Sequence, residues 1–307
     1  MLGAHLSISG GLVNALDKAE RLEMGCVQVF TKNPRQWKVA ELLPRDRDAW
    51  LARLEGLGWK RRRGPRRTVS HNSYLINLAS PDGPMRARSI ALQRVEIERC
   101  EALSIHGCVI HPGAHLGRAR PPGEPHDLEG EPSPGERAGL MRIVSALDRI
   151  HRDLPGYRTI TCLETTAGAG TILGYSFRHL ALIRERLREP GRVGFCFDTC
   201  HVTAAGYDLA TDAGARAVWR QFDALCGRKH LLVFHLNDSV GAVGSRLDRH
   251  AHIGTGRCGR SCFRSIVNQP AFARVPKILE TPKGTNAKGV PWDLVNIRRL
   301  KRLAKIG

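Results

Sequence analysis

The chain has 307 residues, of which 42% are hydrophobic, so it can form one large domain or two average ones. The 48 lysines and arginines outnumber the 29 acidic residues, which gives a net charge of +19. This charge attracts polyanions such as nucleic acid. No apolar stretch approaches the ~18 residues of a membrane span, and no secretory signal is visible at the start. The nine cysteines form no Cys-x-x-Cys pair, so we expect reduced thiols in a cytoplasmic protein.

Short apolar runs alternate with longer amphipathic stretches along the whole chain. Strands are expected at residues 3–8, 27–30, 68–71, 108–111, 160–164, 193–198, 231–236 and 277–281. Helices are expected at residues 12–23, 47–57, 85–102, 136–152, 177–188, 213–226, 260–268 and 291–303. Eight such alternations predict an α/β fold, a single (β/α)8 barrel over residues 1–307. An open doubly wound sheet is the alternative, but no Gly-x-Gly-x-x-Gly turn follows the first strand.

Six of the expected strands end on a residue that can bind metal. These residues are His71, His111, Glu164, Asp198, His235 and Glu280. The carboxyl ends of the strands meet at one face of such a barrel, and active sites lie at that face. Any one of these residues alone is more often a hydrogen-bonding or capping residue than a ligand. The set as a whole predicts a metalloenzyme.

Two further groups of candidate ligands follow in the sequence. His201 comes three residues after Asp198, and Asp248 and His250 stand two apart, on the same side of an extended segment. The candidates then number nine, enough for two or three ions if a carboxylate bridges. Mixed imidazole and carboxylate donors suit Zn²⁺, with Mn²⁺ or Fe²⁺ as lesser options.

The segments around these residues resemble the signature blocks of endonuclease IV, the zinc-dependent family of apurinic/apyrimidinic endonucleases. The blocks appear in the family's order at residues 71–78, 111–113, 163–168, 197–201, 205–208, 235–239, 248–250 and 278–281. The chain departs from the family's pattern at Thr165, where asparagine is frequent.

The resemblance implies a barrel with three zinc ions and assigns each candidate ligand to one of them. One ion would be held by His71, His111 and Glu164, the second by Glu164, Asp198, His235 and Glu280, and the third by His201, Asp248 and His250. Glu164, which would bridge two ions, and Glu280 are the expected catalytic residues.

The resemblance also implies a substrate, double-stranded DNA with abasic or 3′-blocked lesions, and we expect a monomer. Residues 31–37 are similar to the family's loop that enters the minor groove, and Arg35, Tyr74 and Leu75 would wedge the base stack at the lesion. Without the resemblance, an exposed loop arginine and core packing would be the preferred interpretations. The implied reaction hydrolyses the phosphodiester 5′ to an abasic site, leaving a 3′-hydroxyl and a 5′-deoxyribose phosphate, and removes blocked 3′ ends.

Two other functions remain open at this point. A divalent-metal sugar isomerase or epimerase of similar barrel fold would also place carboxylates and histidines at strand ends. A basic nucleic-acid-binding protein with structural metals would bind DNA without cleaving it.

Two segments interrupt the alternation of strands and helices. Residues 60–67 carry six positive charges in eight positions, and we hypothesise that they contact phosphates. Residues 117–135 are rich in Pro, Gly and Glu and are expected to form a mobile loop.

Overall fold

Eight parallel strands close into a barrel in the order β1-β10-β7-β6-β5-β4-β3-β2. The computed structural model describes residues 1–60, 66–119, 121 and 124–304. The barrel strands are β1 (Leu2–His5), β2 (Cys26–Phe30), β3 (Thr68–His71), β4 (Gly107–Ile110), β5 (Ile160–Glu164), β6 (Val193–Asp198), β7 (Leu231–His235) and β10 (Lys277–Leu279). All neighbouring pairs run parallel, including β1 with β10, so the predicted barrel is confirmed.

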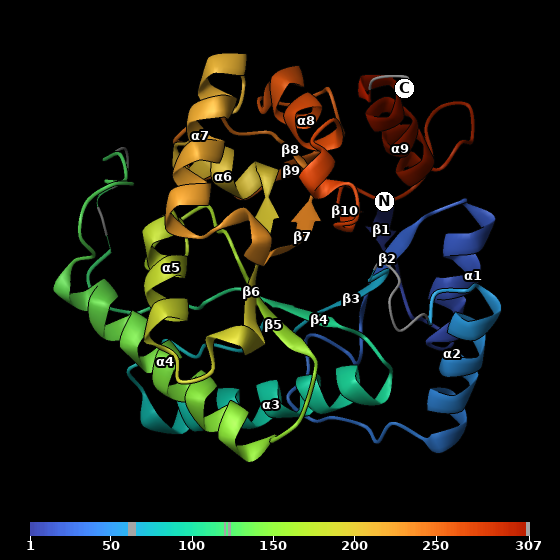
Figure 1. The fold of residues 1–307 in the computed structure, drawn as a ribbon, viewed down its shortest axis with the longest axis horizontal. Helices are drawn as coiled ribbons and strands as arrows, with labels where there is room; N and C mark the ends of the chain where they lie inside the picture. Colours follow the sequence, from blue (N-terminus) through green and yellow to red (C-terminus); the bar gives the residue numbers. More distant parts are fainter. Residues whose placement is uncertain (61–65, 120, 122–123, 305–307) are drawn as a thin grey trace.

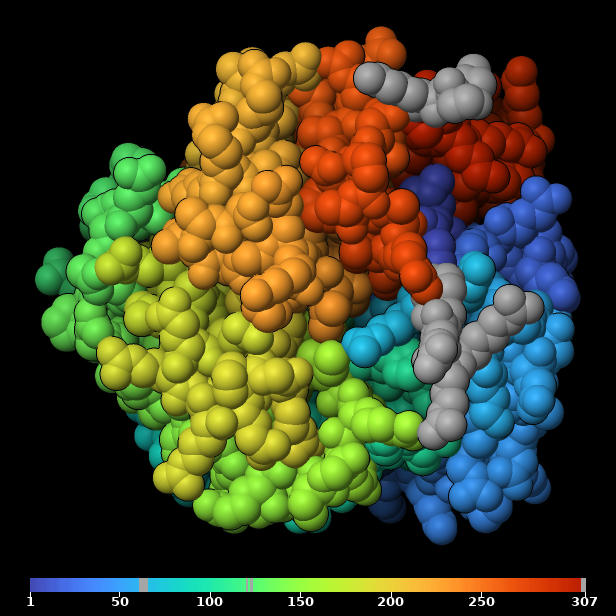
Figure 2. All heavy atoms as spheres, in the orientation of Figure 1, coloured from blue at the N-terminus to red at the C-terminus, as the bar shows by residue number. Residues whose placement is uncertain are grey.

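Helices surround the strands and follow one another in chain order (Figure 1). They are α1 (Val13–Arg21), α2 (Pro44–Gly56), α3 (Gly83–Ala102), α4 (Pro134–Asp153), α5 (Phe177–Arg186), α6 (Thr199–Ala205), α7 (Asp212–Leu225), α8 (Gly259–Val267) and α9 (Trp292–Leu303). Figure 2 shows the blue N-terminal segment lying against the red C-terminal one, where β1 meets β10 and the ring closes. Among the described residues, none of these helices combines the length and apolar character needed to cross a bilayer.

The sequence sets where several helices begin. Ser133 and Glu136 form a capping box at the start of α4, and Asp82, Ser176 and Thr211 each accept a hydrogen bond from the first turn of α3, α5 and α7. These side chains satisfy backbone N–H groups that the helix itself leaves without acceptors. Cap residues and the apolar periodicity together explain why helix boundaries were predicted to within a few residues.

The inside of the barrel is built in two layers. Side chains two residues apart on a strand point to the same face, so each strand contributes an inner residue to each layer. The lower layer, which we call the apolar floor, consists of Cys26, Val69, Val109, Cys162, Cys196, Val233 and Ile278, all almost fully buried. Burying a side chain the size of valine stabilises the fold by about 1.5–3 kcal/mol.

On β1 the corresponding floor position is Gly3, which is paired with Cys26 and Ile278. A Cβ atom at Gly3 would collide with the backbone oxygen of Cys26. Only glycine therefore allows β1 and β2 to approach as closely as the barrel requires.

A second core fills the space between the strands and the outer helices. Phe197 on β6 stacks on Trp219 of α7 with ring centroids 4.7 Å apart, and Phe177 of α5 meets Phe222 edge-on at 5.1 Å. Such pairs add to the stability gained from burial of their surfaces. They hold α5 and α7 against the strands whose ends carry the candidate ligands.

Two elements of the structure were not predicted. Helix α6 follows β6 directly, and its N-cap is Asp198, which accepts a hydrogen bond from the His201 backbone N–H at 2.9 Å. The short strands β8 (Asp238–Ser239) and β9 (His250–Ala251) form a separate antiparallel pair beyond β7. Both elements lie beside the candidate site.

The described end of the basic segment 60–67, Arg66 and Arg67, lies at the amino-terminal face of the barrel. Residues 61–65 lie outside the described residues. Arg66 and Arg67 directly precede β3, and Arg67 Nη1 donates to Gly25 O at 2.8 Å, at the start of β2. The described part of this segment thus lies at the face opposite the carboxyl ends of the strands, and its contacts with phosphates stay a hypothesis.

The described residues of segment 117–135, for which a mobile loop was expected, make specific contacts with their surroundings. Ser176 Oγ donates to Leu128 O at 3.0 Å, the His126 ring stacks on Tyr175 at 3.7 Å, and Glu131 pairs with arginines of α4 and α5. These contacts fix the loop against the beginning of α5.

Candidate metal centre

The upper layer of the barrel interior contains the predicted strand-end residues. His71, Glu164, Asp198 and His235 are the last residues of β3, β5, β6 and β7, while His111 and Glu280 come one residue after β4 and β10. Each stands two positions after a residue of the apolar floor, and all six therefore point into the barrel. His201, Asp248 and His250 complete the nine candidates from α6 and the segment that ends in β9.

The nine residues fall into three groups whose potential ligand atoms lie within 4.8 Å of one another. The groups are His71, His111 and Glu164; Glu164, Asp198, His235 and Glu280; and His201, Asp248 and His250. The structure thus brings together the same sets that the resemblance implied.

Glu164 belongs to two of the groups because its two carboxylate oxygens face different ways. Oε2 lies 3.1 Å from both His71 Nε2 and His111 Nε2. Oε1 lies 2.7 Å from His235 Nδ1 and 3.4 Å from His201 Nδ1. A fully buried carboxylate placed in this way can bridge two cations.

The second group is closed by Glu280, whose Oε2 lies 3.1 Å from His235 Nδ1, and by Asp198, whose Oδ2 lies 3.8 Å from the same nitrogen. In the third group, Asp248 Oδ1 lies 3.0 Å from His201 Nε2 and 3.5 Å from His250 Nε2. The Asp248 side chain is 48% exposed, so this group faces the mouth of the barrel.

Acceptor oxygens outside the groups fix the tautomers of the imidazoles. His71 Nδ1 donates to Asn72 O at 3.0 Å, His201 Nδ1 to Thr165 O at 2.8 Å and His235 Nε2 to Gln28 Oε1 at 2.8 Å. The opposite nitrogen of each ring, which faces its group, is then free to offer a lone pair. Histidines that bind metals in proteins have this arrangement almost without exception.

The attraction between carboxylates and imidazoles in the site outweighs the effect of burial on their pKa values. Burial alone would raise the pKa of Glu164 and of Glu280, but the neighbouring imidazoles, His235 foremost, hold both well below the usual range. The pKa of His201 is raised well above its usual value, despite burial, by the surrounding carboxylates, Asp198 foremost. The carboxylates are therefore ionised and require positive charge next to them, which either protons or divalent cations can supply.

One nitrogen of the candidate ligands makes no hydrogen bond within the described part of the chain, as expected of an atom that binds a metal ion. His250 Nε2 is buried and has no hydrogen-bond partner among the described residues, although it points toward Asp198 and Asp248. Cys196 and Cys200 also approach the groups. Burial raises the pKa of the Cys200 thiol to about 12 and that of Cys196 further, so neither is a thiolate at neutral pH.

The third group depends on a loop that one buried carboxylate holds in place. Asp238 Oδ2 accepts from Gly254 N at 2.8 Å and Gly256 N at 3.0 Å, while Oδ1 accepts from Ser239 N and Cys258 N at 2.9 Å each. The β8–β9 pairing places Ser239 opposite His250. The carboxylate of Asp238 thereby positions the segment that contributes His250.

The predicted DNA-contact residues lie on two adjoining loops at the mouth of the barrel. Ser73 Oγ donates to Pro34 O at 2.6 Å, which links the loop of Tyr74 to that of Arg35. The Tyr74 ring lies 6.2 Å from the His71 ring, yet its residue is 63% exposed, so the core-packing interpretation is wrong for it. Arg35 is exposed and Leu75 is half-buried.

Sequence reasoning missed Gln28, which contacts two candidate ligands. Its side chain reaches His235 Nε2 and Glu280 Oε1. The signal was a single amide among the apolar residues of the run Cys26–Phe30, at a position that alternation places on the inner face.

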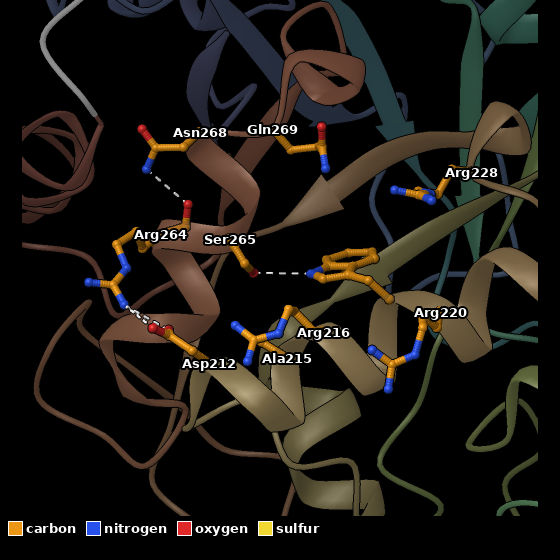
Figure 3. Close-up of a pocket in the computed structure, with 10 residues that line it drawn as sticks. Asp212, Ala215, Arg216, Arg220, Arg228, Arg264, Ser265, Asn268 and Gln269 are labelled. Atoms are coloured by element: carbon orange, nitrogen blue, oxygen red, sulfur yellow. Dashed lines mark hydrogen bonds and ion pairs between the residues drawn. The ribbon is translucent and has the colours of Figure 1, made fainter.

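A separate groove lies on the outer wall, between α7 and α8. It has a volume of about 480 Å³ and is lined by Arg216, Arg220, Arg228 and Arg264 (Figure 3). Arg264 forms two hydrogen bonds with Asp212, at 2.7 and 2.6 Å. None of its lining residues belongs to the three groups, so the groove is distinct from the candidate metal centre.

Comparison with known proteins adds independent information. The family described as xylose isomerase-like TIM barrel matches residues 16–302. "Probable endonuclease 4" of Geobacter sulfurreducens is 43% identical over 304 residues, covering 99% of this chain and 94% of the relative. The crystal structure of endonuclease IV from Thermus thermophilus matches with a TM-score of 0.80 and 31% identity, covering 98% of each chain.

A similar barrel also occurs in a solved structure of low sequence identity. A D-tagatose 3-epimerase-like protein matches with a TM-score of 0.68, covering 98% of this chain and 96% of that one, but at 18% identity, which shows the fold alone. The relatives from Geobacter sulfurreducens and Chloroflexus aurantiacus, 43% and 42% identical over nearly the full length, are both described as probable endonuclease 4. The chain therefore belongs to the endonuclease IV family of the xylose isomerase-like TIM barrels.

Proposed function

We propose that this chain is a zinc-dependent DNA repair endonuclease that hydrolyses the phosphodiester 5′ to an abasic site. The products are a 3′-hydroxyl and a 5′-deoxyribose phosphate, and the same site removes blocked 3′ ends. The observation that carries the proposal is the set of three ligand groups joined by the two oxygens of Glu164 at the mouth of the barrel.

Three Zn²⁺ ions are the proposed occupants, one for each group. Imidazole and carboxylate donors with no thiolate suit zinc in a catalytic site. Divalent ions bound there would supply activated water at neutral pH and neutralise the charge of the phosphate. His71, His111, Glu164, Asp198, His201, His235, Asp248, His250 and Glu280 would hold the ions.

The protein's own groups then have distinct roles around the phosphodiester. Glu164 would contribute one carboxylate oxygen to each of two groups, and Glu280 completes the group that Glu164 shares with His235. The half-exposed Asp248 holds the third group at the entrance, where it would help to hold an ion within reach of the phosphodiester. Ionised carboxylates in this number also keep the site from binding a phosphate unless cations are present.

Recognition of the lesion is assigned to the two joined loops. Tyr74, Leu75 and Arg35 are proposed to enter the base stack, because Tyr74 is exposed beside the first group and Arg35 lies on the adjoining loop. Moving a nucleotide out of the stack costs a few kcal/mol, and the cost is least where base pairing is already lost. An undamaged nucleotide carries a base that the site must also accommodate, and this favours the abasic sugar.

Double-stranded DNA is the proposed partner, and the net charge of +19 supports it. The nine cysteines are all free and buried, which fits the reducing conditions of the cytoplasm. A monomer is proposed because duplex DNA must reach the mouth of the barrel.

A divalent-metal sugar isomerase or epimerase has less support. An isomerase that uses one or two ions does not require the third group, whose residues come from α6 and from the segment ending in β9 rather than from barrel strands. The similarity to an epimerase-like structure, at 18% identity, shows a shared fold and no shared activity.

A duplex oligonucleotide with one stable abasic analogue tests the proposal. The purified protein is expected to hold about three zinc ions and to cut the duplex once, 5′ to the analogue, leaving an undamaged duplex of the same sequence intact. A zinc chelator should abolish cutting, and added Zn²⁺ should restore it. Failure of the zinc-loaded protein to cut at the lesion, together with turnover of a ketose, would favour the epimerase.

A further inference from the structure

The upper layer of the barrel has two positions that hold no candidate ligand. Six of the eight strands carry a ligand there or one residue beyond their end, and β1 and β2 instead carry His5 and Gln28. Gln28 stands two positions after Cys26 of the apolar floor, so its side chain points inward. It is completely buried, although it carries a polar amide.

Chemistry fixes which end of the Gln28 amide faces which neighbour. The Glu280 carboxylate can only accept hydrogen bonds when ionised, so the amide nitrogen lies toward it, with Nε2 2.7 Å from Glu280 Oε1. The amide oxygen is then directed at His235, 2.8 Å from its Nε2. An amide oxygen can only accept, so the proton of the neutral imidazole is on Nε2, and the lone pair is on Nδ1.

The Nδ1 atom of His235 is the one that faces the second ligand group. It lies 2.7 Å from Glu164 Oε1 and 3.1 Å from Glu280 Oε2. One glutamine therefore acts on two members of that group at once, since it selects the tautomer of the imidazole and restrains the carboxylate.

We propose that Gln28 is a positioning residue that preorganises His235 and Glu280 to bind the ion of the second group. The inference rests on the proposed function in one respect, namely that divalent ions occupy the groups. It goes beyond that function because Gln28 is not one of the nine candidate ligands.

An apolar side chain of similar size would fill the same space, so packing does not explain the amide. Burying an amide without partners costs several kcal/mol, and this cost is offset only when its hydrogen bonds are made. Gln28 makes three, because its Nε2 also lies 3.0 Å from His5 Nδ1. All three partners lie in the upper layer, and two of them are candidate ligands.

The test is the zinc affinity of the full-length protein, measured by competition with a chromogenic chelator. Gln28→Met keeps the length of the side chain and removes both hydrogen-bonding ends. Loss of a group that orients a metal ligand typically costs 10–100-fold in metal affinity. We expect a loss of that size for one of the bound ions, with the others retained.

A matched control separates positioning from a general effect of removing a buried polar group. Thr161 lies on β5, is equally buried, and its hydroxyl has no hydrogen-bond partner among the described residues. Thr161→Val should leave all zinc affinities unchanged. The visible spectrum of the cobalt-substituted protein should change in Gln28→Met and stay unchanged in Thr161→Val, because only the former alters ligand geometry.

Gln28→Glu provides a second variant if Gln28→Met fails to fold. It keeps the shape of the side chain and an acceptor for His235 but replaces the amide donor to Glu280, so the affinity for one ion should change at least tenfold. Unchanged zinc affinity in the folded variants would overturn the inference while leaving the proposed function intact. Conversely, a wild-type protein that binds zinc but does not cut abasic DNA would overturn the function and not the role of Gln28.

Discussion

Replacing Asp238 with asparagine should detach the loop that positions the third ligand group. The Asp238 carboxylate is buried and accepts four backbone hydrogen bonds, two on each oxygen, from Ser239 and from three residues of 254–258. Asparagine has nearly the same shape, but an NH₂ group takes the place of one oxygen. Two backbone N–H groups then face a donor instead of an acceptor.

The size of the effect follows from the hydrogen bonds that are lost. A hydrogen bond to a charged group contributes about 1.5–3 kcal/mol, so two of them contribute about 3–6 kcal/mol. At 1.4 kcal/mol per tenfold change, local opening of the loop should increase by a factor of about 10² to 10⁴. His250 pairs with Ser239 across β8 and β9, so opening of the loop moves it away from His201.

Three measurements check this prediction. Hydrogen exchange at residues 248–258 should accelerate, the zinc content should fall by about one ion per chain, and cleavage of abasic DNA should fall at least 100-fold. Asp82→Asn is the control, because asparagine caps a helix as well as aspartate does and α3 should keep its cap. Wild-type exchange protection together with a full complement of zinc in Asp238→Asn would refute the reasoning.

Four further predictions follow from the site and the barrel. Glu164→Gln removes the negative charge that two ligand groups share. Elemental analysis should show a loss of two zinc ions, and a nicking assay should show no cleavage. Retention of all zinc would contradict the bridging role. Tyr74→Ala should weaken binding to an abasic duplex at least tenfold with normal zinc content; equal affinity for the wild type and the variant would exclude this tyrosine from lesion recognition. Burial lowers the pKa of His151 and of His179 to about 4, whereas both have a pKa of about 6.5 in the unfolded chain. As the pH falls from 6.5 toward 4, the unfolded chain therefore binds more protons than the folded chain. Unfolding free energy should therefore drop by about 2 kcal/mol per histidine between pH 7 and pH 5, and His179→Gln should reduce that pH dependence in denaturant titrations. Gly3→Ala should prevent or severely destabilise barrel closure, since the new Cβ would collide with a backbone oxygen of β2, and a normal melting temperature would show that the strands can separate there.

The barrel was predictable because its strands and ligands follow a simple spacing. In β6, for example, the run Val193–Asp198 is apolar up to its last residue, and Asp198 stands two positions after Cys196. Alternation alone then places the carboxylate on the inner face at the carboxyl end. The same logic applies to Glu164 and His235, so the position of the site could be inferred before any contact was known.

Features that depend on local capping and pairing were not predictable in this way. Helix α6 has only seven residues and begins at a cap, Asp198, that was already explained as a ligand. The β8–β9 pair has two residues per strand, which is too short for a periodic signal. Gln28 was missed because an amide within an apolar strand indicates a buried partner but does not say which one.

The basic segment 60–67 shows how chain order adds to an argument from composition. Its described end, Arg66 and Arg67, directly precedes β3 and therefore lies at the amino-terminal face of the barrel. The charge of the segment suggested phosphate contacts, and chain order places these two arginines at the face opposite the candidate ligands.

Six of the barrel strands must help to close the barrel and must also carry a candidate ligand at or just after their end. Different residues serve the two purposes, those of the apolar floor and those of the layer above it. Closure of the barrel depends on residues such as Val69 and Val233, while the proposed binding of ions depends on His71 and His235, only two residues further along. Mutations can therefore alter what is bound without loosening the packing that keeps the ring intact. This separation offers a physical reason why proteins with other activities retain the same barrel at 18% identity.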